Sequence, residues 1–225
     1  MTSYYTTAIS YLREVLYPRR CSGCFVRGEH LCERCLNGIR ASALAPILIN
    51  NPFDRSVFNY QHPAVKRLVW KLKYKKVEGV STLMAKLIYE RLVEELADWL
   101  ALEATGGQLI LIPTPATKKR KHERRFNQAE SIAHKLAALD PKHLVVRADL
   151  LTKTRETLPQ ASLGRKERLK NLVGAFEIKD GKDLAGRTVA VIDDVITTGA
   201  TITEARRALK KAGAARVYAL SFAQG

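Results

Sequence analysis

VAVIDDVITTGAT, residues 189–201, decides the fold of this 225-residue chain. Its first four residues are continuously apolar and predict a buried strand of a parallel sheet. Asp193 and Asp194 follow at the carboxyl end of that strand, which is where open α/β sheets bind their ligands. A loop of small residues then leads into a helix, so its backbone N–H groups and the helix dipole predict an anion site. Gly199 permits the tight turn, and Thr201 with Glu204 has the spacing of a capping box.

The segments around this stretch alternate between strand and helix patterns. Such alternation predicts a parallel sheet covered by helices on both faces. Strands are expected over residues 109–113, 143–146, 188–195 and 216–223, and helices over 127–139 and 202–212, the last of which closes at Gly213.

The N-terminal half has weaker patterns. Residues 4–16 predict a short amphipathic helix, and residues 56–60 a short strand within a proline-containing connector. Residues 64–77 form a basic amphipathic segment whose apolar side is Val65, Leu68, Val69 and Leu72. A long helix is expected from about Ser81, as its N-cap, to Ala104.

Four cysteines lie close together as two CxxC pairs, at positions 21, 24, 32 and 35. Four thiolates suit tetrahedral zinc, and so small a module would take most of its folding energy from the metal. A redox dithiol pair and an iron–sulfur cluster are the alternatives. The candidate metal ligands are Cys21, Cys24, Cys32 and Cys35.

A second candidate phosphate-binding segment follows the strand at residues 109–113. Basic residues crowd the stretch after Pro115 and could neutralise a pyrophosphate, bind a nucleic-acid backbone, or form a solvated face. The candidates for the pyrophosphate are Pro115, Lys118, Lys119, Arg120, Arg124 and Arg125, with Lys121 in the same run.

The acid pair and loop resemble the phosphoribosyl-diphosphate (PRPP) motif of type I phosphoribosyltransferases. That resemblance implies that Asp193 and Asp194 form the catalytic pair and hold the ribose hydroxyls, with magnesium accompanying PRPP. It also implies that the 5-phosphate is wrapped by Thr197, Thr198, Gly199, Ala200 and Thr201.

Most of the chain resembles the ComF family, which joins a cysteine-rich zinc module to a phosphoribosyltransferase-like domain. The resemblance rests on the cysteines, on Pro113-Thr114-Pro115 and on residues 124–128, RRFNQ, where Arg125 replaces the glycine of the family. It implies a zinc module over residues 1–45 and a phosphoribosyltransferase-like domain over 46–225. Polar residues 152–172 would form a mobile lid, with the family positions Gln160, Arg168 and Asn171.

The net charge of +16 indicates polyanionic partners. No apolar run is long enough to span a membrane and no secretory signal is visible, so a cytoplasmic protein is expected. The ComF resemblance implies a role in natural competence, the uptake of single-stranded DNA. It also makes competence-machinery proteins and a second copy of the chain, as a homodimer, candidate partners.

Two further hypotheses remain open at the level of sequence. The chain could be an active magnesium-dependent phosphoribosyltransferase of nucleotide or amine metabolism that does not bind DNA directly. It could also be a sensor that binds PRPP without catalysis. The ribose-phosphate motif is shared by enzymes and sensors, and no residue identifies an acceptor substrate.

Overall fold

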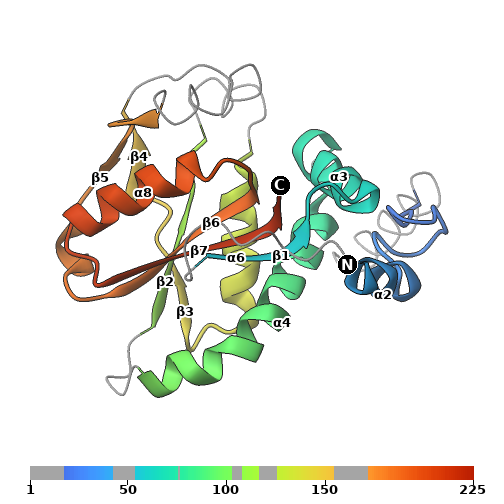
Figure 1. The fold of residues 1–225 in the computed structure, drawn as a ribbon, viewed down its shortest axis with the longest axis horizontal. Coiled ribbons are helices and arrows are strands. Elements are labelled where there is room, and N and C mark those ends of the chain that lie inside the picture. The colour runs from blue at the N-terminus through green and yellow to red at the C-terminus, as the bar shows by residue number, and fades with distance from the viewer. Residues whose placement is uncertain (1–17, 43–53, 76, 103–107, 117–125, 155–171) are drawn as a thin grey trace, which may run out of the picture.

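The computed structural model describes residues 18–42, 54–75, 77–102, 108–116, 126–154 and 172–225 (Figure 1). The helix expected over residues 4–16 lies outside the described residues, as does the boundary expected between residues 45 and 46. None of the helices in the described part of the chain is long and apolar enough to cross a membrane.

The centre of the molecule is a parallel sheet of five strands in the order β1-β7-β6-β2-β3. Its two longest strands, β6 and β7, are apolar and almost entirely buried, as strands covered on both faces must be. The sheet confirms the predicted fold class. The strands are β1 (Asp54–Asn59), β2 (Leu109–Pro113), β3 (Leu144–Val146), β6 (Thr188–Ile196) and β7 (Arg216–Gln224).

Helices cover both faces of the sheet (Figure 1). On one face, α3 (Pro63–Trp70), α4 (Glu78–Leu102) and α6 (Gln128–Leu139) share one hydrophobic core with Ala190 and Ile192 of β6. On the other, α8 (Ala200–Lys211) packs against Val189 and Val191. A short antiparallel hairpin that the sequence patterns did not predict, β4 (Leu151–Lys153) and β5 (Phe176–Ile178), extends this second core.

The strand order reverses between β2 and β6, which are neighbours in the sheet. From β2 the chain passes through α6 to β3 on one side, and from β6 it passes through α8 to β7 on the other. Ligands of open α/β sheets bind outside the carboxyl ends of the strands at such a switch point. The residues at the carboxyl ends of β2 and β6 are therefore the candidate ligand site.

Two predicted helix starts are wrong. Helix α4 begins at Glu78, and Ser81 is a fully buried residue within it rather than its N-cap. Helix α8 begins at Ala200, with Gly199 as an N-cap that makes no side-chain hydrogen bond. Because Gly199 is the N-cap, Thr201 and Glu204 lie inside α8 and do not occupy the positions of a capping box. The Glu204 carboxylate accepts from the backbone N–H of Gly174 and pairs with Arg207.

The basic amphipathic segment changes helix type along its length. It is α-helical in α3 and continues as a π-helical turn, η1 (Lys71–Lys75). The predicted apolar side is confirmed, since Val65, Leu68, Val69 and Leu72 are all buried.

Candidate functional site: a phosphate-binding loop and a four-cysteine cluster

The acid pair lies within β6, near its carboxyl end and next to the end of β2. Asp193 is opposite Ser221 of β7, and Pro113 of β2 is opposite Ile192. The Thr114 N–H donates to the Ile192 carbonyl over 2.9 Å, which extends this pairing by one residue. The Pro113-Thr114-Pro115 segment is thereby held beside the acids, at the switch point of the sheet.

The loop after the acids turns directly into α8. Gly199 has φ 74°, the left-handed conformation that favours glycine, and its carbonyl accepts the first backbone hydrogen bond of α8 from Thr203. The Thr198 hydroxyl accepts from the Ala200 N–H at 3.4 Å. Thr197 is exposed, and Thr198 and Thr201 are half-buried. Hydroxyls and backbone N–H groups therefore lie together at the N-terminus of a 12-residue helix, where an anion is favoured.

The electrostatics of the acid pair depend on a residue that the sequence patterns did not single out. Lys73 of η1 places its Nζ 2.8 Å from Oδ2 of Asp194, whose side chain is only 10% exposed. Burial lowers the pKa of Lys73, but the carboxylates of Asp194 and Asp193 outweigh it and raise this pKa above its usual value. No local pattern identifies this pairing, because Lys73 is one of several lysines in a basic segment and Asp194 lies far away along the chain.

Asp193 is the less buried member of the pair. Its Oδ1 accepts a hydrogen bond from the Asp194 N–H over 2.9 Å. Burial and the adjacent Asp194 carboxylate raise the pKa of Asp193 to about 7, and Lys73 acts in the opposite direction. The pair is thus a site of concentrated negative charge that groups donating hydrogen bonds, or cations, would stabilise.

The described residues that flank the basic run lie at this site. Asn127 caps α6 by accepting from the Ala129 N–H, and its side-chain amide donates to the Thr114 carbonyl over 3.1 Å. The residues just before and just after the basic run are therefore hydrogen-bonded to each other. The predicted pyrophosphate residues Lys118, Lys119, Arg120, Arg124 and Arg125 fall outside the described residues, whereas Pro115 is described and half-buried.

Residues 152 and 153, which were expected in the mobile lid, belong to strand β4 instead, and the C-terminal end of the predicted lid reaches the start of α8. Leu172 and Ala175 form a small buried cluster with Ala200, the first residue of α8. The Thr154 N–H donates to the Ala175 carbonyl over 3.0 Å, so the segments at the two ends of the predicted lid lie side by side. The predicted lid residues Gln160, Arg168 and Asn171 lie outside the described part of the chain.

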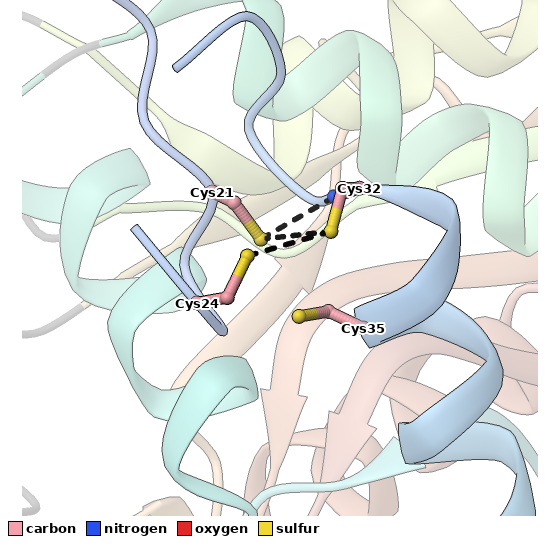
Figure 2. Close-up of side chains that lie close together, drawn as sticks. All are labelled: Cys21, Cys24, Cys32 and Cys35. Atoms are coloured by element: carbon pink, nitrogen blue, oxygen red, sulfur yellow. Dashed lines mark hydrogen bonds between the residues drawn. The ribbon is translucent and has the colours of Figure 1, made fainter. Parts of the chain in front are cut away.

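The four cysteines converge as the spacing predicts (Figure 2). Their sulfur atoms all lie within 4.8 Å of one another, so together they could hold one metal ion. Cys32 Sγ is 3.6 Å from both Cys21 Sγ and Cys24 Sγ, and all four thiols are free. Cys32 is the N-cap of α2 (Glu33–Ala41), and Cys35 lies in the first turn of this helix.

Backbone hydrogen bonds orient the sulfur atom of Cys21. Cys21 Sγ accepts hydrogen bonds from the N–H groups of Gly23 and Cys32, each over 3.3 Å. Burial raises the pKa of Cys21, but these hydrogen bonds outweigh it and lower the pKa to about 6. A Cβ at Gly23 would lie 2.5 Å from Cys35 Sγ, so glycine is required where the two CxxC pairs meet.

The cysteine module packs against the same segment that supplies Lys73. The Arg67 side chain donates to the Ser22 carbonyl over 2.5 Å, and Lys71 donates to the Arg20 carbonyl over 2.6 Å. His30 packs on Gly79 at the start of α4, where a Cβ would lie 2.5 Å from the imidazole Nε2. The α3–η1 segment therefore contacts the cysteine module and the acid pair at the same time.

A cluster of exposed aromatic and basic side chains follows the outer side of this segment. The rings of Trp70 and Tyr74 lie 5.9 Å apart, and Lys75 lies over the Trp70 ring at 5.6 Å. Arg67 lies over the exposed ring of Phe25 at 5.1 Å, which joins the cysteine module to the surface. Trp70 and Tyr74 are exposed, whereas Phe126, just before α6, is half-buried against the core.

Comparison with known proteins agrees with this arrangement. Residues 128–224 match the family model of the phosphoribosyl transferase domain. The chain is 27% identical over 213 residues to competence protein F of Haemophilus influenzae, covering 91% of this chain and 90% of that protein. It is 31% identical over 157 residues to DNA utilization protein YhgH of Escherichia coli O157:H7, where the match spans just under two thirds (65%) of the relative.

A longer match to the same kind of protein decides the family. DNA utilization protein YhgH of Salmonella typhimurium is 30% identical over 173 residues, which are 74% of this chain and 70% of the relative. Together with the transferase domain and the four-cysteine cluster, this match shows that the chain belongs to the ComF family.

Proposed function

We propose that this chain is a PRPP-binding protein that acts on single-stranded DNA during natural competence. The observation that carries the proposal is the acid pair and threonine-rich loop at the switch point between β2 and β6. Carboxylates accept hydrogen bonds from the hydroxyls of a ribose, and the N-terminus of α8 favours a phosphate. Only two residues separate the acid pair from the loop, so the two groups are close enough to bind one ribose phosphate.

In this proposal Asp193 and Asp194 bind the 2′- and 3′-hydroxyls of the ribose. Thr197, Thr198, Gly199, Ala200 and Thr201 enclose the 5-phosphate through hydroxyls and backbone N–H groups. Magnesium takes oxygen ligands, and a bound ion would neutralise the pyrophosphate.

We assign the pyrophosphate to Pro115, Lys118, Lys119, Arg120, Arg124 and Arg125. The assignment is supported by Thr114 and Asn127, which join the two flanks of the run beside the acid pair. The lid is assigned to Gln160, Arg168 and Asn171, and the contacts of Leu172 and Ala175 with Ala200 support it.

The experiment is a calorimetric titration of PRPP, with magnesium, into the wild type and an Asp193→Asn variant. Asp180→Asn is the matched control, since Asp180 is an exposed acid beside the C-terminal end of α8, at the opposite end of this helix from the loop. Binding by the wild type and the control that is lost in Asp193→Asn supports the site. Equal binding by all three proteins would contradict it, and no binding by any would remove PRPP from the proposal.

Catalysis is a separate proposal with its own assay. A phosphoribosyltransferase would release pyrophosphate from PRPP, and its catalysis would consist of positioning and charge stabilisation. Release of pyrophosphate with an added base or amine would identify an enzyme. Tight binding without release would instead identify a PRPP sensor.

We propose zinc as the ion of the cysteine cluster. Four thiolates about 2.3 Å from a tetrahedral zinc ion would lie roughly 3.8 Å from one another. The 3.6 Å separations of Cys32 Sγ from Cys21 Sγ and Cys24 Sγ fit that arrangement. Metal analysis of the purified protein should give about one zinc per chain. Iron with a brown colour, or no metal, would overturn the assignment.

The aromatic and basic surface supports direct binding of single-stranded DNA. Bases stack on exposed aromatic rings, and lysine and arginine attract the phosphates. Trp70, Tyr74 and Phe25 supply the rings, with Arg67 and Lys75 beside them. The names of the relatives, competence protein F and DNA utilization protein YhgH, point in the same direction. A cytoplasmic location, competence-machinery partners and a homodimer belong to this proposal.

Fluorescence anisotropy with a labelled oligothymidine tests this surface. Trp70→Ala/Tyr74→Ala should weaken binding by about 10-fold or more, since stacking contributes roughly 1–3 kcal/mol per base. Val173→Ala, an exposed apolar residue on another part of the molecule, is the control. Unchanged binding in the double variant, or binding that is insensitive to salt, would contradict the proposal.

A further inference from the structure

Lys73 is the one residue of η1 whose charged group reaches the acid pair. In the same five-residue turn, Leu72 is fully buried, and Tyr74 and Lys75 are exposed. Lys71 points to the cysteine module instead, where it donates to the Arg20 carbonyl. A π-helical turn has an extra residue per turn and is frequent at functional sites. Within this turn, Lys71 therefore contacts the cysteine module and Lys73 contacts the acid pair.

The contact between Lys73 and Asp194 differs from an ordinary surface ion pair. The two side chains are 28% and 10% exposed, and their charged atoms lie 2.8 Å apart. Charges that are taken out of water in this way cost free energy unless they are paired, so the position is specific. The partner is one of the two carboxylates expected to bind the ribose. A pair at that place sets the charge of the site as well as its shape.

We propose that Lys73 is a positioning residue of the PRPP site, which keeps the Asp193–Asp194 pair ionised and directed at the ribose hydroxyls. This inference rests on the proposed PRPP binding and assigns the site a permanent cation supplied by the chain itself. Lys73 is part of the chain, so its charge is in place without a bound metal ion. The empty site is thereby prepared to accept hydrogen bonds from the ribose before the ligand arrives.

The charged groups around Lys73 determine how its removal would act. Within the described residues, Asp194, Asp193 and Tyr60 are the titratable groups that influence it. Lys73 lowers the pKa of Asp193, while burial and Asp194 raise it. Without the lysine charge the pair would release its last proton at higher pH. Carboxylates that carry a proton accept fewer hydrogen bonds, so PRPP binding would require a higher pH.

The test is PRPP titration at pH values from 6 to 9 for the wild type, Lys73→Met, Lys73→Arg and a control. Lys86→Met is the control, because Lys86 is an exposed lysine on α4. We expect Lys73→Met to weaken PRPP binding about 10-fold or more at neutral pH, which corresponds to roughly 1.4 kcal/mol. The loss should shrink toward pH 9. Lys73→Arg should restore most of the affinity and the wild-type pH profile.

Three results would overturn the inference. Wild-type affinity in Lys73→Met would mean that the cation does not matter. A loss of equal size at every pH would mean that Lys73 acts in another way. Failure of the wild type to bind PRPP would remove the proposed function and this inference with it, which distinguishes the two failures. If Lys73→Met does not fold, Lys73→Gln takes its place, because it keeps a hydrogen-bond donor near Asp194 without the charge.

Discussion

The cysteine module and the sheet differ in what stabilises each of them. Within residues 18–42, the buried side chains are those of Cys21, Ser22, Leu31 and Ile39. In the sheet, β7 alone has eight consecutive buried residues. The module has no apolar core of its own, because Cys21, Leu31 and Ile39 join the core that continues into α3, α4 and the sheet. A metal bound by the four cysteines would therefore supply much of the folding free energy of the module. The difference predicts that mutations should affect the two regions separately.

The largest effect is expected from removing two of the four proposed metal ligands. Cys21→Ser/Cys32→Ser should lose the metal, and with it the binding free energy of about 10–16 kcal/mol that folds such modules. The module should become sensitive to protease, while the thermal transition of the sheet persists. Metal analysis, limited proteolysis and calorimetry check this.

Ser22→Ala is the control for that variant. The Ser22 hydroxyl is buried and has no hydrogen-bond partner among the described residues, so its removal should cost little. Simultaneous unfolding of the sheet in the double cysteine variant would show that the two regions are one cooperative unit.

The next largest effect belongs to the core of the sheet. Leu111 of β2 is fully buried, and Leu111→Ala should lower the free energy of unfolding by about 2–5 kcal/mol because it leaves a cavity. Val173→Ala, at a side chain that is 64% exposed, should change it by less than about 0.5 kcal/mol. Denaturant titration gives both values. The metal content should be unchanged in Leu111→Ala, and loss of metal would contradict the separation of the two regions.

A smaller effect is expected within the module itself. Gly23→Ala places a methyl group against Cys35 Sγ and should weaken metal binding by about 10-fold, as changes around a metal site typically do. Gly38→Ala is the matched change, because Gly38 lies in α2 with no atom within 4 Å of the added carbon. It should instead stabilise the helix by about 0.5–1 kcal/mol. Competition with a chelator measures the first effect, and equal affinity in both variants would be the contrary result.

The smallest effect is expected where the module meets α4. Arg40 and Glu90 form an ion pair at 2.9 Å, with side chains 51% and 40% exposed. Glu90→Ala should therefore cost less than about 1 kcal/mol, and less still at high salt. Glu177→Gln, at an exposed acid elsewhere, is the control. A larger loss of stability would mean that the contact between the two regions contributes more than its exposure suggests.

The local features of the site were predictable because each is written in consecutive residues. Short runs of neighbouring residues predict β6, the acids near its carboxyl end, Gly199 and the two CxxC pairs. The structure has each of these features where the patterns indicated. The errors at Ser81 and at Thr201 with Glu204 have one cause. Ser81 and Thr201 have side chains suited to a helix start, but tertiary packing placed the starts of α4 and α8 earlier. The Glu204 carboxylate binds Gly174 and Arg207.

By itself the sequence determined the alternation of strands and helices, the acid pair with its loop, and the four sulfur ligands. Hydrophobic period, glycine and cysteine spacing are properties of short segments, so they survive without knowledge of the fold. Only the tertiary structure decided that β2 and β6 are neighbours and that Lys73 pairs with Asp194, 121 residues away. Those contacts depend on which faces bury one another, and no local pattern specifies that choice.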